Sequence, residues 1–309
     1  MVKLASCLVL GGSGFIGSHI TEQLVLLEND VTVFDKTLNK KNLAGVLDKT
    51  KFVKGDFQNS AEVREALKGN EIVFHCIHST FPRESVGKAL FDAQTNIVPS
   101  VSLMESAVKE NVEKIVYISS IAVYGNPEKI PITETHKTNP ITPYAASKIA
   151  IENYLELFRL TSGLNYAVLR PTAAYGERQA MTSKTGVINN FVFSAIQGKP
   201  IEIFGDGSTV RDLTHAEDIA TAAAKAAFMK TKSRLFNIGT GKGITLNELA
   251  EKVRQITNSK SKIIRTESRA DPEKHVFDVL RANKELGWSA RISLDEGIAR
   301  VFRAQKGAE

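Results

Sequence analysis

The stretch that decides the fold of this chain is LVLGGSGFIG, at residues 8–17. A short apolar run leads there into three evenly spaced glycines, Gly11, Gly14 and Gly17. Glycines let a backbone approach a pyrophosphate closely, and the N-terminus of the following helix supplies free N–H groups and a favourable dipole. The stretch therefore predicts a strand, a phosphate-binding turn and a helix that begins near Phe15 and Ile16. Taken alone, the glycines could also mark an ordinary tight turn.

Carboxylates follow the next two expected strands. Asp35 closes an apolar run at residues 31–35, where a carboxylate would accept hydrogen bonds from an adenosine ribose and repel a 2′-phosphate. This position favours NAD over NADP, although the neighbouring Lys36 acts against that preference. Asp56 and Phe57 follow the third strand and are expected near the adenine; alternatively, Asp56 caps the next helix.

The rest of the chain alternates apolar runs with amphipathic segments up to about residue 170. The expected strands cover residues 4–10, 31–35, 51–54, 72–76, 114–119, 166–170 and, further on, 235–238. Expected later helices cover residues 188–197, 216–229 and 246–257. This pattern predicts an α/β fold with a Rossmann-type doubly wound parallel sheet. We expect an NAD-binding domain from residues 1–172 and about 213–238, and a smaller α/β substrate domain from about 173–212 and 239–309.

Composition narrows the class of protein. The 309 residues carry a net charge of +6, but the Lys and Arg residues are scattered, so no nucleic-acid partner is expected. Apolar runs fall well short of the roughly 20 residues that span a membrane. The N-terminal apolar run passes directly into the glycine turn, which predicts a cytoplasmic protein without a signal peptide. Cys7 and Cys76 lie in expected strands and are interpreted as core residues without a disulfide or a metal.

A tyrosine and a lysine four residues apart are the candidate catalytic pair. Tyr144 and Lys148 occur in the segment PYAASK, and a spacing of four places them on one face of a helix. The lysine ammonium would stabilise a phenolate and lower the tyrosine pKa, so Tyr144 could act as a base. Ser120 follows the fifth strand, at the carboxyl edge where such sheets bind ligands, and could hydrogen-bond the reacting oxygen.

In this order along the chain, these features resemble the extended short-chain dehydrogenases, specifically the NAD-dependent epimerase/dehydratase family. The resemblance runs from end to end and includes the segments IFGDGSTVRD at residues 203–212, NIGTG at 237–241 and KELGW at 284–288. It implies NAD as cofactor and a nucleotide sugar as substrate. It also implies that Arg211 and Arg269 contact the substrate diphosphate, for which the guanidinium fork is well suited.

Two positions after Ser120 distinguish members of this family. Where its dehydratases carry Asp and Glu, this chain has Ile121 and Ala122, so elimination of water lacks its acid and base. The resemblance then implies an epimerase, most simply a UDP-hexose 4-epimerase, in which the sugar is oxidised to a keto sugar and reduced on its other face. A nucleotide keto-sugar reductase or dehydrogenase and a non-catalytic NAD-sensing protein are the alternatives.

Two departures from the family pattern leave the substrate open. Ala173 stands where many epimerases have an asparagine that contacts the phosphate. The loop at residues 75–82 carries His78 where the family has small residues; this histidine could touch the nicotinamide or sugar, or serve a structural role. Neither the sugar nor the nucleotide base follows from the sequence.

The helix expected at residues 145–160 is apolar around most of its circumference. Its polar stripe is narrow and consists of Glu152, Glu156 and Arg159. Burial of one face would leave Ile151, Leu155 or their neighbours exposed. Together with the resemblance, this implies a homodimer held by a four-helix bundle of this helix and the one near residues 93–110.

Overall fold

A seven-stranded parallel sheet forms the larger part of the molecule. The computed structural model describes residues 4–179, 186–267 and 274–307. Within these, the strand order is β11-β6-β5-β4-β1-β2-β3, and every pairing is parallel. The strands are β1 (Ser6–Leu10), β2 (Asp30–Asp35), β3 (Thr50–Lys54), β4 (Ile72–His75), β5 (Lys114–Ile118), β6 (Asn165–Pro171) and β11 (Leu235–Ile238). The predicted doubly wound parallel sheet is confirmed.

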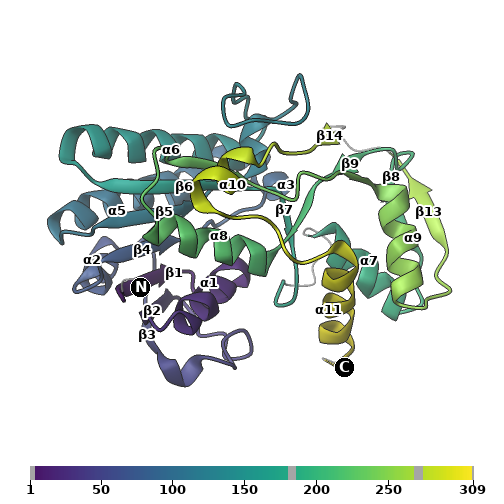
Figure 1. The fold of residues 1–309 in the computed structure, drawn as a ribbon, viewed down its shortest axis with the longest axis horizontal. Helices are drawn as coiled ribbons and strands as arrows, with labels where there is room; N and C mark the ends of the chain where they lie inside the picture. The colour runs from purple at the N-terminus through teal and green to yellow at the C-terminus, as the bar shows by residue number, and fades with distance from the viewer. Residues whose placement is uncertain (1–3, 180–185, 268–273, 308–309) are drawn as a thin grey trace.

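Helices cover both faces of this sheet (Figure 1). One face carries α1 (Phe15–Leu26) and α8 (Ala216–Phe228); the other carries α2 (Ser60–Leu67), α5 (Val98–Lys109) and α6 (Pro143–Ser162). Successive side chains of a strand point to opposite faces, so Cys7 and Val9 pack toward α1 and α8, whereas Leu8 and Leu10 pack toward α5 and α6. The alanine-rich sequence of α8 lets α1 pack closely against it.

The smaller lobe is assembled from short sheet fragments and three helices, on the right of Figure 1. β8 (Ile201–Phe204) pairs with β13 (Ile263–Thr266), and β9 (Val210–Arg211) lies between β12 (Ile244–Thr245) and β14 (Lys274–His275). A separate core joins the β8–β13 pair to α7 (Val187–Ile196), α9 (Leu246–Ile256) and α11 (Leu294–Lys306). The pair β7 (Ala173–Tyr175) and β10 (Leu213–His215) continues β6 and precedes α8.

Short elements complete the chain. α10 (Leu280–Leu286) packs on β11 and α8, so part of the C-terminal segment lies against the large sheet. The others are η1 (Leu47–Lys49), α3 (Pro82–Ser85), α4 (Ala89–Asp92), the π-helical η2 (Ala93–Ile97) and η3 (Ile121–Tyr124). Cys7 and Cys76 are free thiols. None of the helices in the described part of the chain has the length and apolar character that crossing a bilayer requires.

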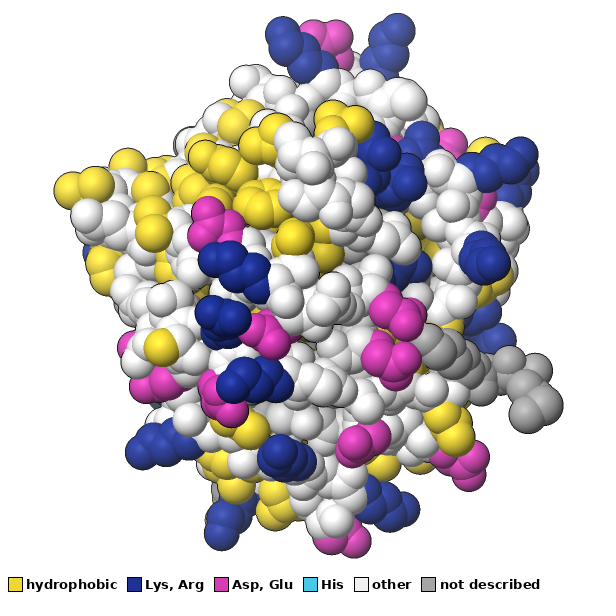
Figure 2. Space-filling view, turned by 90° about the vertical axis from the view of Figure 1, so that its left-hand side faces the viewer, with side chains coloured by type: hydrophobic (Ala, Val, Ile, Leu, Met, Phe, Trp, Pro, Cys, Tyr) yellow, Lys and Arg dark blue, Asp and Glu magenta, His cyan; other side chains and the backbone are white. Residues whose placement is uncertain are grey.

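Large apolar side chains are exposed on α4, α5 and α6. Figure 2 shows hydrophobic side chains gathered in the upper left of the face that looks out from the α2, α5 and α6 side of the molecule. Ile151 and Leu155 are buried in the core, and the exposed positions on these three helices are Leu90, Phe91, Val98, Tyr154, Leu157 and Leu160. Glu152 departs from the expected polar stripe because it is buried and paired with Arg170.

Candidate active site

The glycine loop forms a tight turn between β1 and α1. Gly11 has a φ of +77°, which favours glycine. A Cβ on Gly17 would lie 2.1 Å from the carbonyl oxygen of Gly11, so the loop closes on itself only with glycine there. Gly14 precedes the first helical residues, Phe15 and Ile16, and within the described chain no side chain caps this helix end. The backbone N–H groups of the first turn are thus available to an anion, as a dinucleotide pyrophosphate requires.

Asp35 ends β2 beside this loop. Its carboxylate accepts hydrogen bonds from the Ser13 hydroxyl (2.8 Å) and from the Lys36 backbone N–H (2.9 Å). The Lys36 ammonium pairs with Asp56, with Nζ 3.0 Å from Oδ2. The structure therefore places Asp35 and Asp56 at the same edge of the sheet as the glycines, and it turns the charge of Lys36 toward Asp56.

Asp56 and Phe57 differ in their surroundings. Asp56 does not cap the next helix, because the side chain of Asn59 accepts the hydrogen bonds at the start of α2. Burial would raise the pKa of Asp56, but the Gln58 N–H and Lys36 outweigh it and lower the pKa. The Phe57 ring is buried in the core and stacks at a tilt on His75, 4.9 Å between centroids. Because its ring is buried, Phe57 could contact a cofactor only through its backbone atoms.

The candidate catalytic side chains meet at the carboxyl end of β5. Tyr144 and Lys148 lie one turn apart on α6, with the Lys148 ammonium 5.6 Å from the centre of the Tyr144 ring. Lys148 Nζ also donates a hydrogen bond to the carbonyl of Ile118, the last residue of β5 (2.8 Å). Ser120, which caps the short helix η3, lies close enough to the Tyr144 phenol to lower its pKa. The structure thus brings the predicted tyrosine, lysine and serine together.

In the protein without a bound cofactor, burial has the largest effect on the pKa values of Tyr144 and Lys148. It raises the pKa of Tyr144 to about 12, against the lowering effect of the hydrogen bond to Ser120. Burial also lowers the pKa of Lys148 to about 7, while Cys76, Glu152 and Asp92 act in the opposite direction. A further positive charge beside Tyr144, such as an oxidised nicotinamide ring, would favour the phenolate.

A buried ion pair fixes α6 against the sheet one turn beyond Lys148. Both guanidinium arms of Arg170 donate to Glu152, at 3.1 Å from Nε and 2.5 Å from Nη2. The Arg170 guanidinium also lies 4.8 Å from the centre of the Tyr124 ring. Breaking such a buried pair by removing one partner costs about 3–5 kcal/mol, so these contacts hold the catalytic helix in register.

Two further residues lie at Tyr144: Asp92, which the sequence did not indicate as part of the site, and His78, whose role it left open. The ring of His78 meets the Tyr144 ring edge-on, 4.5 Å between centroids. Asp92, fully buried at the end of α4, lies with Oδ2 3.6 Å from His78 Nε2. The unusual loop at residues 75–82 gave a signal for His78. Asp92 gave none, because its neighbours come from distant parts of the chain.

The predicted substrate arginines belong to the smaller lobe. Arg211 lies on β9, opposite His275 of β14. His275 Nε2 in turn lies 2.9 Å from the carbonyl oxygen of Gly125, just beyond η3. Arg211 is therefore linked to the Ser120 side of the site through one strand. Arg269 lies outside the described residues. Ala173, on β7, is half-buried.

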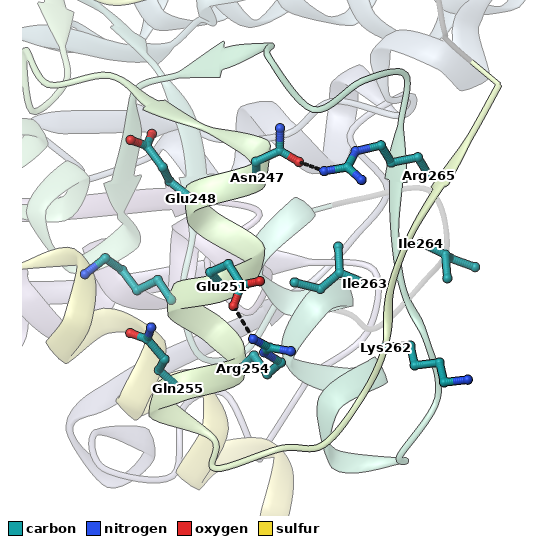
Figure 3. A pocket seen from close by; sticks show the side chains of 10 residues that line it. Asn247, Glu248, Glu251, Arg254, Gln255, Lys262, Ile263, Ile264 and Arg265 are labelled. Carbon is teal, nitrogen blue, oxygen red and sulfur yellow. Dashed lines mark hydrogen bonds and ion pairs between the residues drawn. The ribbon is translucent and has the colours of Figure 1, made fainter.

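A separate hollow lies far from these residues. Figure 3 shows the groove between α9 and β13, with Asn247 hydrogen-bonded to Arg265 and Glu251 paired with Arg254. It occupies the end of the smaller lobe remote from α6 in Figure 1. Across the described ranges, no cluster of three or more His, Cys, Asp and Glu side chains is placed to hold a metal ion.

Comparisons with known proteins agree with this fold. Residues 7–239 match the model of the NAD dependent epimerase/dehydratase family. A putative UDP-glucose 4-epimerase of Methanocaldococcus jannaschii is 34% identical over 97% of this chain and 98% of its own length. The crystal structure of a Thermotoga maritima UDP-glucose 4-epimerase with UDP-glucose superposes with a TM-score of 0.92 at 33% identity, covering 98% of this chain and 100% of that one. A Thermus thermophilus UDP-glucose 4-epimerase in complex with NAD gives a TM-score of 0.90 at 31% identity, with the same coverage.

Proposed function

Because this chain belongs to the NAD dependent epimerase/dehydratase family, we propose that it is an NAD-dependent epimerase that inverts C4 of a UDP-hexose. The observation that carries the proposal is the meeting of Tyr144, Ser120 and Lys148 at the carboxyl edge of the sheet. Ile121 and Ala122 follow Ser120, so the carboxylates that water elimination would use are not at these positions. Oxidation and re-reduction need no group beyond the triad and the cofactor.

The residues of this chain have separate roles in that reaction. NAD, when bound, supplies the acceptor and donor for the hydrogen of the sugar carbon. The glycine loop and Asp35 hold its pyrophosphate and ribose. Tyr144 removes the proton from the sugar hydroxyl and returns it after the keto sugar has rotated to present its other face. Ser120 hydrogen-bonds the same oxygen, and the Lys148 ammonium favours the phenolate form of Tyr144.

Substrate recognition is assigned to the lobe that carries Arg211. The Arg211 guanidinium can donate two parallel hydrogen bonds to a diphosphate. Arg269 is proposed as the second arginine that binds the diphosphate. With Ala173 in place of an amide side chain, the phosphate has one donor fewer on the β7 side. We therefore expect binding of the substrate diphosphate to depend strongly on these two arginines.

A panel of UDP-hexoses, incubated with purified protein without added cofactor, tests the function. Conversion of UDP-glucose to UDP-galactose, with NAD released on denaturation, is the expected result. Protein that contains no NAD and is active only with added NADPH would instead establish a keto-sugar reductase. Absence of conversion for every UDP-hexose, from NAD-loaded protein, would refute the UDP-sugar assignment.

The proposed assembly is a homodimer formed through α5 and α6. It is supported by the exposed side chains of Leu157 and Leu160 on α6 and Val98 on α5, with exposed fractions of 48%, 65% and 64%. A contiguous apolar surface of this kind marks an interaction site. Two copies of α5 and α6 would form a four-helix bundle. Sedimentation should give a dimer for the wild type and a monomer for Leu157→Glu/Leu160→Glu; a wild-type monomer at micromolar concentration would contradict the proposal.

Domain boundaries and location complete the proposal. We assign residues 1–172 and about 213–238 to NAD binding, and about 173–212 and 239–309 to the substrate. Within the last segment, α10 packs on β11 and α8 and so belongs to the core of the large sheet. A cytoplasmic location is favoured by the free thiols of Cys7 and Cys76, since a reducing compartment keeps thiols unpaired.

A further inference from the structure

Asp92 is a buried carboxylate in direct contact with the segments that hold Tyr144. Its side chain is fully buried, and it accepts short hydrogen bonds from the hydroxyls of Thr80 and Ser147. Thr80 belongs to the loop after β4, whereas Ser147 lies on α6 directly before Lys148. Asp92 therefore ties the loop and the catalytic helix together at one point.

The same carboxylate lies beside His78. Asp92 Oδ2 lies 3.6 Å from His78 Nε2, and the imidazole ring contacts Tyr144 edge-on. Burial lowers the pKa of His78 to about 4, with Lys148 adding to that effect and Asp92 opposing it. At neutral pH the imidazole is thus uncharged and does not neutralise Asp92. Burial would raise the pKa of Asp92, but the neighbouring His78 and the hydroxyls of Ser147 and Thr80 lower it to about 2, so it is ionised.

The remaining charges around Tyr144 cancel or are absent. Glu152, on α6, is neutralised by Arg170 of β6. Burial raises the pKa values of the Cys76 thiol and the Tyr117 phenol and lowers that of His75, so all three are uncharged at neutral pH. Among these described residues, Lys148 and Asp92 are the two whose charges are not neutralised by a partner in an ion pair.

Lys148 needs such an anion. It is 3% exposed, and among the described residues it forms no ion pair with a carboxylate. An isolated buried ammonium tends to lose its proton, because the charged form has been taken out of water. Burial lowers the pKa of Lys148, and Cys76, Glu152 and Asp92 each act to raise it.

We propose that Asp92 is a positioning residue of this active site, whose buried carboxylate is the counter-charge that keeps Lys148 protonated beside Tyr144. The inference rests on the proposed function for its catalytic meaning. The contacts with Thr80, Ser147 and His78 fix where that charge lies. The π-helical turn η2 follows Asp92 immediately, and turns of this kind are frequent at functional sites.

Asp92→Asn keeps the shape of the side chain and removes its charge. In Asp92→Asn the pKa of Lys148 falls. The Lys148 ammonium therefore loses its proton at a lower pH in the variant than in the wild type. The pKa of Tyr144 falls as well, because the Asp92 charge raises it, so the phenolate forms at lower pH. The whole pH profile of kcat/KM therefore moves to lower pH, by about one unit for the loss of a neighbouring charge. A purely structural residue would change the height of the profile and leave its position.

Thr80→Val is the matched control. It removes a hydrogen bond to the same carboxylate but keeps the charge, so its profile should hold the wild-type position. Both variants are compared with the wild type in their NAD-loaded forms, with UDP-glucose as substrate and with thermal unfolding as the measure of folding. If Asp92→Asn does not fold, Asp92→Ser removes the charge with a smaller side chain.

Phenolate absorbance gives a second readout that needs no turnover. NAD-loaded wild type and Asp92→Asn are titrated, each with its Tyr144→Phe counterpart subtracted. The expected result is a midpoint about one pH unit lower in the variant. If the wild type converts no UDP-hexose, the proposed function fails while this titration still tests Asp92. Equal midpoints and equal profiles for wild type and the Asp92 variant would overturn the inference, as would an equal displacement in Thr80→Val.

Discussion

The two halves of the candidate site are built in different ways. The glycine loop follows β1, and Tyr144 and Lys148 lie on α6 beside the carboxyl end of β5. Both strands belong to one seven-stranded sheet, in which the core fixes their positions. Arg211 lies on a two-residue strand, held by β12 and β14, which are themselves only two residues long. A rigid sheet thus positions the chemistry, while short, sequence-distant pieces position the substrate.

This difference explains how one framework can serve several substrates. The β8–β13 pair and helices α7, α9 and α11 share a core of their own, so changes there can leave the large sheet and α6 in place. Function is carried by sites grafted on such frameworks. Variants in the two halves should accordingly separate into effects on the rate of the chemical step and effects on binding.

The largest effect is expected from Tyr144→Phe. Removing the phenol oxygen leaves the ring packed against His78 but abolishes proton transfer, so kcat should fall about 10³-fold. The NAD content and the thermal unfolding midpoint should stay close to wild type. Tyr154→Phe is the control, since Tyr154 lies on the same helix with an exposed side chain. A kcat within tenfold of wild type for Tyr144→Phe would remove this residue from the proposed mechanism.

A smaller effect, of the other kind, is expected from Arg211→Ala. Loss of charge-assisted hydrogen bonds to the diphosphate should raise KM for UDP-glucose by about 30-fold and change kcat much less. Arg265→Ala is the control, because Arg265 lies on the exposed strand β13 of the same lobe and contacts Asn247. If Arg211→Ala lowered kcat while KM stayed constant, the division between a chemical half and a binding half would be wrong.

The sequence predicted the first half of the site far better than the second. The glycine turn, Asp35 and the Tyr144–Lys148 spacing are local patterns: each lies within one strand, turn or helix, so short-range geometry determines them. The parallel sheet followed from the same alternation of strands and helices. Strand ends moved by one or two residues, as with β1, which begins at Ser6 instead of Leu4.

Long-range contacts could not be predicted in this way. Glu152 was expected on an exposed polar stripe, but its partner Arg170 comes from β6, so pairing across the core explains its burial. Asp92 collects hydrogen bonds from residues 12 and 55 positions away in sequence. His275, which links Arg211 to Gly125, is 150 residues from its partner. No local pattern encodes such contacts; they arise when the fold closes.

The smallest effect is expected from Asp35→Asn, which tests how the cofactor is chosen. The amide keeps the shape of the side chain but loses the charge that accepts ribose hydrogen bonds and repels a 2′-phosphate. NAD should bind about tenfold more weakly, as expected for loss of a charge-assisted hydrogen bond, and the preference for NAD over NADP should narrow. Asp30→Asn is the control at the other end of the same strand.

Lys36 makes this test more selective. Its ammonium is paired with Asp56 3.0 Å away, so Asp35→Asn alone does not deliver a cation to an incoming 2′-phosphate. Adding Asp56→Asn releases Lys36, and NADP binding should then improve further, while any contact of Asp56 with the adenine would appear as an added loss of NAD binding. Titration of each variant with both cofactors measures this. If the double variant gained nothing for NADP, the Lys36–Asp56 pair would have no part in cofactor choice, and the preference would rest on Asp35 alone.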